Sequence, residues 1–359
     1  MPKKSTNGWR LAGYAAGLLI CGSTHAQRSV TLYGVMDDAL LYTSKSLNPT
    51  TGGNAGKVFA MANGDTSYSY FGFNGIEDLG DGLTAQFKLE SGVSVANGAL
   101  ASCNGNLFGC QAWISLDSKY GEAKAGLQLS PFFYALYESD PRNFSFFGSG
   151  AVNLVGNFLG TAIFTPNTVS YTSPDLGGLR TSLLYGFGGV SGNFRAGRQY
   201  SASVKYEYGG LMVNAAIFDS NSGGANPTPT PTDLAAEGRT IGAAFKFGVL
   251  TVKASFVNYK VAGSFNNNVY GGGLSWFVMP ALVLDGGVWL TSDRDHTTNH
   301  SLLAAMGMNY FLSKRTALYA QVATVNNHGA MNTGVSIPVA LYGTKGTTVG
   351  ASIGIRHSF

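Results

Sequence analysis

From residue 27 onward the chain repeats one pattern. Eight to twelve residues alternate between apolar and polar, and a cluster of glycine, asparagine, aspartate or proline follows. In LTVKASF (residues 250–256), for example, every second residue is apolar. This alternation has the period of a β-strand, whose two faces meet different surroundings. The runs have the length of a tilted strand that crosses a membrane, and no long helical periodicity competes with them.

Sixteen such runs are predicted, and each has its own starting point in the chain. They begin near Val30, Thr66, Leu83, Phe108, Glu122, Asn167, Leu179, Arg198, Leu211, Gly238, Leu250, Asn268, Ala281, Ser301, Thr316 and Gly346.

The composition favours a membrane protein. Charged residues make up 12% of the chain, about half the share of roughly 25% in soluble domains, and glycine is abundant, with 50 of 359 residues. Outside the extreme N-terminus, the sequence has no apolar run of the roughly 20 residues that a membrane-spanning helix needs. The sequence therefore predicts a protein that crosses the membrane with strands.

The linkers between the runs predict how the strands are arranged. Long polar linkers (residues 44–65, 93–107, 130–165, 188–197, 220–237, 260–267, 291–300 and 326–345) alternate with short turns such as PDLGG and LSKR. Long and short connections then lie on opposite rims of an antiparallel sheet. In hydrocarbon, the unpaired edges of such a sheet are satisfied only when it closes. We therefore predict an all-β fold, a 16-stranded antiparallel transmembrane β-barrel around an aqueous lumen.

The N-terminal segment, residues 1–26, is predicted to be a cleaved signal peptide. Lys3, Lys4 and Arg10 precede the apolar stretch LAGYAAGLLICG, and Ala26 ends a plausible cleavage site. A single membrane anchor and a lipoprotein signal acylated at Cys21 are the alternatives. Cleavage leaves residues 27–359 as the barrel with a net charge of about +1, which gives no electrostatic argument for nucleic-acid binding.

Two cysteines remain in the mature chain, Cys103 and Cys110. Because an exported protein meets an oxidising compartment, a disulfide between them is predicted, with two unpaired thiols as the alternative.

The last strand ends in GIRHSF, with Phe359 as the final residue on its apolar face. Amphipathic aromatic rings favour the membrane interface, so aromatic residues near strand ends are predicted to form a girdle. They are Tyr206, Tyr208, Trp276, Trp289, Tyr310 and Phe359.

The mature chain resembles the trimeric general porins of the Gram-negative outer membrane, of the β-proteobacterial type. The likeness is carried by SVTLYGVMDDALLY, FGFNGIEDLGDGLTAQFKLESG, QAWISLDSKYGEAKAGLQ, NTVSYTSPDLGGL and the closing GIRHSF. It implies a homotrimer in the outer membrane, in contact with lipid and lipopolysaccharide. It also implies a channel for passive diffusion of small hydrophilic solutes and ions. In that family the terminal aromatic residue, here Phe359, is an assembly signal for the barrel assembly machinery.

The resemblance also implies that the third long loop folds into the lumen and narrows it. In this loop, Glu138 and Asp140 are the candidate acidic side of the constriction, with Arg142 beside them. A solvated surface loop with incidental charges is the alternative.

The wall that faces this loop departs from the family pattern. Tyr70, Cys110 and Leu127 stand where arginines are usual, and Asn74 stands where Lys or Arg is common. We therefore expect a neutral to cation-preferring pore. Alternation assigns further inward positive charges to the wall: Lys88, Lys124, Arg198, Lys205, Lys253 and Arg356.

Catalytic and metal-binding patterns are weak. SDRDHTTNH contains His296 and His300 near Asp293 and Asp295, but it equally fits a polar loop. Ser191 lies among glycines without matching a nucleophile elbow. We predict no enzyme activity, no cofactor and no metal. A substrate-specific channel, a closed barrel acting as adhesin or structural protein, and a soluble secreted β protein are the alternative functions.

Overall fold

The computed structural model describes residues 29–101, 103–158, 162–221 and 232–359, so the predicted signal peptide lies outside the described residues. Within these ranges the chain forms strands and two helices. They are β1 (Ser29–Leu47), β2 (Asn54–Ala62), β3 (Tyr70–Gly80), β4 (Leu83–Gly92), β5 (Gln111–Ser118), β6 (Gly121–Leu129), α1 (Pro131–Ser139), α2 (Gly150–Phe158), β7 (Phe164–Thr172), β8 (Leu179–Gly186), β9 (Gln199–Tyr208), β10 (Leu211–Ser220), β11 (Ala236–Phe247), β12 (Leu250–Val261), β13 (Phe265–Met279), β14 (Leu282–Asp293), β15 (His300–Phe311), β16 (Thr316–His328), β17 (Thr333–Ser336), β18 (Ala340–Tyr342) and β19 (Gly346–Ser358).

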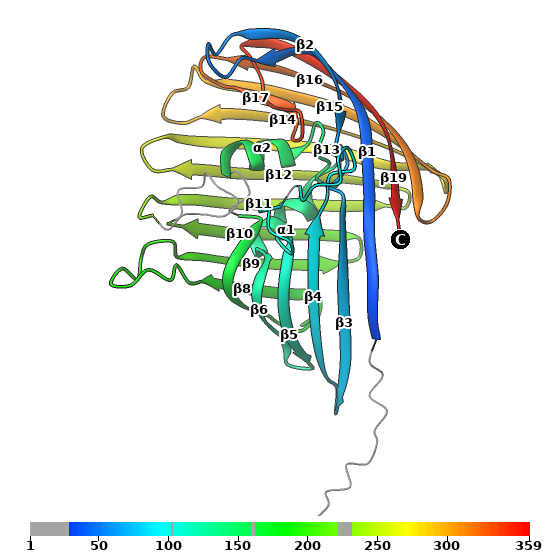
Figure 1. The fold of residues 1–359 in the computed structure, drawn as a ribbon, viewed down its shortest axis with the longest axis vertical. Coiled ribbons are helices and arrows are strands. Elements are labelled where there is room, and N and C mark those ends of the chain that lie inside the picture. Colours follow the sequence, from blue (N-terminus) through cyan, green and yellow to red (C-terminus); the bar gives the residue numbers. More distant parts are fainter. Residues whose placement is uncertain (1–28, 102, 159–161, 222–231) are drawn as a thin grey trace, which may run out of the picture.

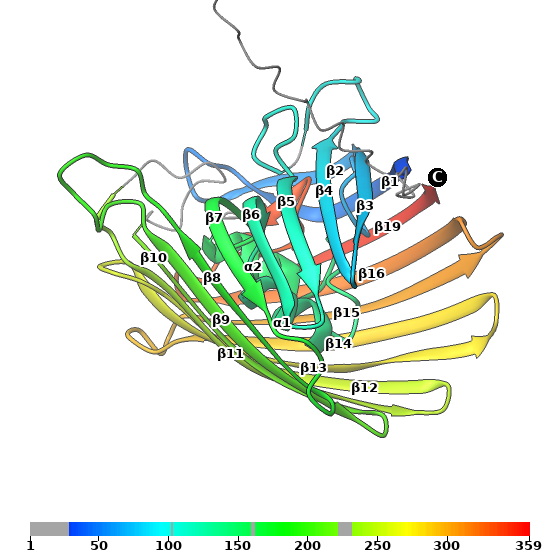
Figure 2. The ribbon, with the colours of Figure 1, turned by 90° about the horizontal axis from the view of Figure 1, so that it is seen from below.

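Sixteen of these strands, β1, β3 to β16 and β19, pair antiparallel in a closed ring. The first and last strands complete it, because β1 pairs with β19 from Val35 to Thr43 and with β3 from Ser29 to Val35. Figure 1 shows β1 and β19 side by side, and Figure 2 shows the ring from below. The predicted barrel is confirmed, and each predicted strand start lies within four residues of the observed one.

Three short strands lie in segments that the sequence assigns to loops. β2 pairs with β1 from Ala39 to Leu47. It continues the edge of β1 that β3 occupies from Ser29 to Val35. β1 is 19 residues long, more than a tilted crossing needs, so its far end would otherwise expose unpaired backbone groups. β17 and β18 form a small separate hairpin within the last long loop.

The outward face is apolar, as predicted. Leu40, Ile114 and Met306 are 60%, 61% and 68% exposed, and the aromatic residues Tyr206, Tyr208, Trp276, Tyr310 and Phe359 are also exposed. Trp289 contradicts the predicted girdle. It is 2% exposed because it points inward and packs against the third loop, where Pro141 lies beside the same inner-wall glycine, Gly287.

The third long loop enters the ring and carries both helices, which lie inside it in the two ribbon views (Figures 1 and 2). The Ser130 hydroxyl caps α1 by accepting a hydrogen bond from the Phe133 N–H, and Pro131 occupies the first turn. Within the described residues, neither helix is long or apolar enough to cross a membrane.

The inner wall is apolar where this loop rests on it. Phe132 of α1 and Phe158 of α2 both pack against Phe218 of β10 and Tyr259 of β12, with ring centroids 5.2–6.3 Å apart. These four side chains are almost completely buried. Inward side chains of β10 and β12 are therefore apolar, because the loop, and not water, covers that part of the wall.

Two glycines of β11 lie where α1 packs against the inner wall. A Cβ added at Gly238 would lie 2.5 Å from the Phe132 ring, and one added at Gly242 would lie 2.3 Å from Cβ of Ser139. No side chain fits at these distances. Glycine therefore sets how closely the helix approaches the wall.

We predict that Gly238→Ala loosens the third loop. The added methyl group must displace the buried Phe132 ring, which should cost about 1–3 kcal/mol and make the loop more sensitive to limited proteolysis. The control is Gly272→Ala, because a Cβ there meets no atom closer than 3.7 Å. If the third loop is equally resistant to proteolysis in both variants, the proposed role of Gly238 in packing against α1 is contradicted.

Candidate functional site

Arg142 fastens the third loop to the barrel wall. Its Nε donates to Oδ1 of Asp285 on β14 at 2.6 Å, and its Nη2 donates to Oε1 of Gln321 on β16 at 2.5 Å. Its Nη1 donates to the carbonyl oxygens of Phe147 and Gly148 within the loop. Arg142 is only 4% exposed. It was predicted to line the constriction, but it is a buried anchor.

Asp140 is also turned away from the open channel. It is 3% exposed, and its carboxylate accepts hydrogen bonds from the N–H groups of Arg142, Phe144 and Gly150. Burial raises the pKa of Asp140 above its ordinary value, although these hydrogen bonds act in the opposite direction. The prediction that Asp140 supplies the acidic side of the constriction is therefore wrong, because its oxygens are used to fold the loop.

Glu138 is the one of the two predicted acids that faces the lumen. It is partly exposed and accepts a hydrogen bond from Nζ of Lys205 at 2.7 Å and another from Nδ2 of Asn214 at 3.3 Å. Lys205 also pairs with Glu207 at 3.2 Å. The acidic side of the loop is thus neutralised by the strand beneath it, which sequence alternation alone does not reveal.

The three wall positions that were predicted to oppose the loop differ in their placement. Tyr70 begins β3 and lies against Tyr33 and Tyr68. Cys110 is completely buried in a disulfide with Cys103, so it does not line the channel. Leu127 is partly buried and packs against the hydrophobic cluster that contains Cys110.

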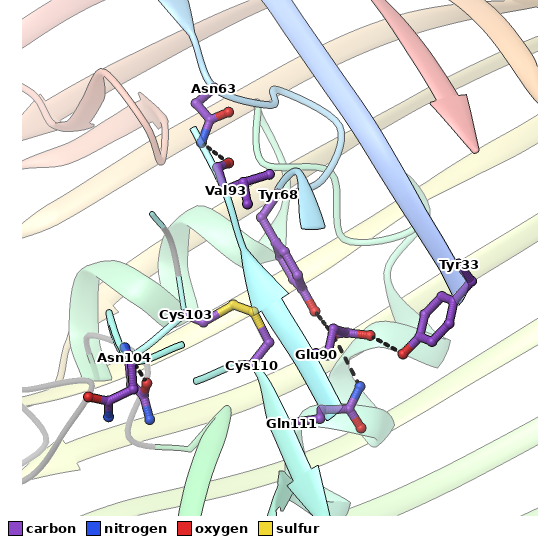
Figure 3. The surroundings of a disulfide bond; sticks show 10 residues. Tyr33, Asn63, Tyr68, Glu90, Val93, Cys103, Asn104, Cys110 and Gln111 are labelled. Atoms are coloured by element: carbon purple, nitrogen blue, oxygen red, sulfur yellow. Dashed lines mark hydrogen bonds between the residues drawn. A yellow bond between two sulfur atoms is a disulfide. The ribbon is translucent and has the colours of Figure 1, made fainter. Parts of the chain in front are cut away.

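A buried acid that the sequence analysis did not single out holds this wall together. Glu90 of β4 accepts hydrogen bonds from the hydroxyls of Tyr33 and Tyr68 and from Nε2 of Gln111 (Figure 3). The disulfide lies next to this cluster, and the Cys110 N–H donates to the Glu90 carbonyl. Glu90 and Lys88 are two residues apart and therefore share one face of β4. This spacing is the feature of the sequence that could have identified Glu90 as an inward residue.

Among the predicted inward cations, Lys88 and Lys124 lie over the ring of Trp113, with Nζ 6.0 Å and 4.3 Å from its centroid. Arg356 pairs in register with Asp37, which lies on the inward face. Lys253 donates to the Asp140 carbonyl at 3.0 Å, so it supports the loop from β12.

Arg198 is not on the inner wall. It lies over Tyr200, which occupies the opposite face of β9 from Lys205.

Asp65, in the connection between β2 and β3, joins several parts of the structure. Its carboxylate accepts hydrogen bonds from Ser336 of β17 at 2.9 Å and Ser352 of β19 at 2.6 Å. Its carbonyl accepts one from Ser145 of the third loop. The pKa of Asp65 is raised to about 6, chiefly by burial and to a smaller extent by the carboxylates of Asp37 and Asp38, while the two serine hydrogen bonds act in the opposite direction.

The histidine segment offers no evident metal centre. His296 pairs with Asp293 at 3.4 Å, and among the described residues no three His, Cys, Asp or Glu side chains are arranged to hold a metal ion.

The chain is similar to known outer-membrane proteins over almost its whole length. Residues 12–330 match the Gram-negative porin family. An outer membrane porin protein of Bordetella pertussis is 28% identical, and the alignment covers 97% of each chain. Outer membrane porin protein 32 of Delftia acidovorans is 26% identical, over 96% of this chain and 98% of that protein.

Solved structures agree with these matches. An anion-selective porin from Comamonas acidovorans has a TM-score of 0.78 and 26% identity, covering 92% of this chain and 100% of that one. A trimer form of the outer membrane protein OmpT of Vibrio cholerae has a TM-score of 0.66 at 15% identity, which shows a shared fold. That match covers 92% of this chain and 99% of that one.

We predict that Arg142→Met releases the third loop from the wall. The change leaves the buried Asp285 carboxylate without its cation, with only the hydrogen bond from Asn309, which should cost about 3–5 kcal/mol and increase the current noise of single channels. The double variant Arg142→Met/Asp285→Leu removes both charges and should recover much of the loss. If Arg142→Met shows the same single-channel current noise as the unchanged protein, the anchoring role of Arg142 is contradicted.

We predict that docking of the loops at Asp65 strengthens as the pH falls from 7 to 5. Because the pKa of Asp65 is higher in the folded than in the unfolded chain, this stabilisation is fully present below about pH 4 and is lost as the pH rises through about 6, so it should change by about 1 kcal/mol between pH 5 and pH 7. Hydrogen exchange of residues 63–69 across this range measures it. Asp65→Asn should remove the pH dependence, whereas Asp81→Asn, in an exposed turn, should retain it.

Proposed function

The chain belongs to the Gram-negative porin family, whose members form channels in the outer membrane, and we propose that small hydrophilic solutes and ions cross it by passive diffusion. The observation that carries this proposal is the closed ring of sixteen strands, with an apolar outer face and charged side chains on the inner wall. A barrel of this width leaves room for water inside.

The mechanism requires no covalent chemistry. A polar, water-filled lumen spares solutes the cost of losing their hydration in hydrocarbon. The third loop, held by Arg142 and seated on β11, occupies part of the cross-section and so limits the size of solutes that pass. The channel is thus a passage whose width and charge are set by the loop and the facing wall.

We propose that the pore leans towards anions, which replaces the cation preference expected from the sequence. That expectation relied on a wall without the usual arginines, facing Glu138 and Asp140 as free acids. Asp140 is buried, and Glu138 is paired with Lys205. On the facing wall, Lys88 lies over the Trp113 ring and forms no ion pair with any described residue, whereas Lys124 pairs with Glu122. The Comamonas porin, described as anion-selective, supports the same direction.

We further propose that the protein is a homotrimer surrounded by outer-membrane lipid and lipopolysaccharide. A solved relative in trimer form supports this assembly. We also propose that Phe359 is the signal for the barrel assembly machinery. Its backbone pairs with Gly34 at 3.1 and 3.2 Å, and a Cβ on Gly34 would lie 2.5 Å from its exposed ring.

We predict that residues 27–359, refolded and placed in a planar bilayer, give stable conductance steps in groups of three. Under a salt gradient, the reversal potential should indicate chloride preference. Lys88→Gln/Lys124→Gln should shift it towards cations, because two inward charges are lost, while Lys119→Gln in an exposed turn should not. A cation-leaning potential in the unchanged protein would contradict the selectivity, and silence from a folded barrel would contradict the channel.

A further inference from the structure

A cavity of about 280 Å³ lies between α1 and the inner wall formed by β5 to β10. Its size is close to the lower limit of about 300 Å³ for small-molecule sites. Charged side chains, amides and hydroxyls line it together with Tyr134 of α1, whose side chain is 46% exposed. A solute passing the third loop on this side of the lumen meets these groups directly.

The cavity has five charged side chains, two acidic and three basic, and four of them are paired. Lys124 pairs with Glu122 at 3.2 Å, and Lys205 pairs with Glu138 at 2.7 Å. The fifth, Arg180 of β8, is exposed and forms no ion pair with any residue in the described part of the chain. Its planar set of donors therefore remains available for a ligand.

The register of the strands places two positive charges close together, which favours the binding of an anion there. Arg180 lies directly across from Lys205, and like charges in opposed positions of a sheet destabilise each other. Glu138 and Glu207 already share the charge of Lys205. Among these groups the positive charge that lacks a partner is therefore the guanidinium of Arg180.

We propose that Arg180 binds the carboxylate of a small hydroxylated monocarboxylate solute as it crosses the channel. A guanidinium binds a carboxylate through two parallel hydrogen bonds, which a lysine cannot offer. Ser170 and Ser182 on the same wall place hydroxyl oxygens that can accept hydrogen bonds from the hydroxyls of the solute. Gln128 is buried and orients Ser170, whose hydroxyl donates to its Oε1 at 2.7 Å. A second carboxylate would approach Glu122 and Glu138, which disfavours dicarboxylates.

This inference rests on the proposed channel function and goes beyond it, since a general diffusion pore needs no solute site. The site lies beneath α1 on β6 to β9, and it includes Glu138 of the predicted constriction, whereas Tyr70 of β3 and the buried Cys110 do not line it.

The experiment measures chloride current through single channels in a planar bilayer while sodium gluconate, a hydroxylated monocarboxylate, is added. We expect gluconate to reduce the current with a saturable concentration dependence, and glucose, which lacks the carboxylate, to leave no saturable block. Arg180→Gln should raise the half-blocking concentration of gluconate at least tenfold. Arg180→Lys keeps the charge and loses the paired donors, so it should raise this concentration several-fold. Arg195→Gln, in an exposed loop, is the matched control and should not change it.

The outcomes separate the site from the channel. An equal half-blocking concentration in the unchanged protein and Arg180→Gln, or a block that never saturates, would overturn the site, even if the reversal potential shifts. Chloride conductance steps in a variant show that its barrel has folded. If Arg180→Gln gives no such steps, the half-blocking concentration of gluconate is compared between the unchanged protein and Arg180→Lys instead. Absence of chloride current in the unchanged protein would instead overturn the proposed channel.

Discussion

The structure depends on the pairing of its first strand with its last. Within hydrocarbon, an unpaired backbone N–H or C=O costs several kcal/mol, so a sheet of this size persists there only as a closed ring. The contact of β1 with β19 from Val35 to Thr43, extended by Phe359 on Gly34, removes the only two edges the ring would have. The apolar outer face, the aqueous interior and the insertion of a loop all presuppose this closure.

The third loop then changes the chemistry of the interior that it enters. It covers the aromatic residues of β10 and β12, takes Arg142 and Asp140 out of contact with water, and leaves Glu138 paired with Lys205. The loop thus contributes fewer free charges than its sequence contains. What remains open to a solute is chiefly Lys88 beside Trp113 and the cavity that Lys124 and Arg180 line.

The sequence predicted the barrel well and its interior charges poorly, and the reason is the range of the interactions. Whether Lys205 or Leu250 faces in or out depends on strand period alone, which is local. By contrast, Arg142 meets Asp285 143 residues later in the chain, and Glu138 meets Lys205 67 residues later. No spacing rule links such positions, so Asp140 and Arg142 were assigned to the channel and Glu90 and Arg180 were not singled out.

The sequence by itself determined the sixteen strands, the alternation of their faces and the long and short rims, because each follows from side chains a few residues apart. The tertiary structure decided which inward side chains meet water. Trp289 and Phe218 became core residues only when the third loop lay against them. That position is set by close approach at Gly238 and by the buried Arg142–Asp285 pair, contacts that exist only once the ring has closed.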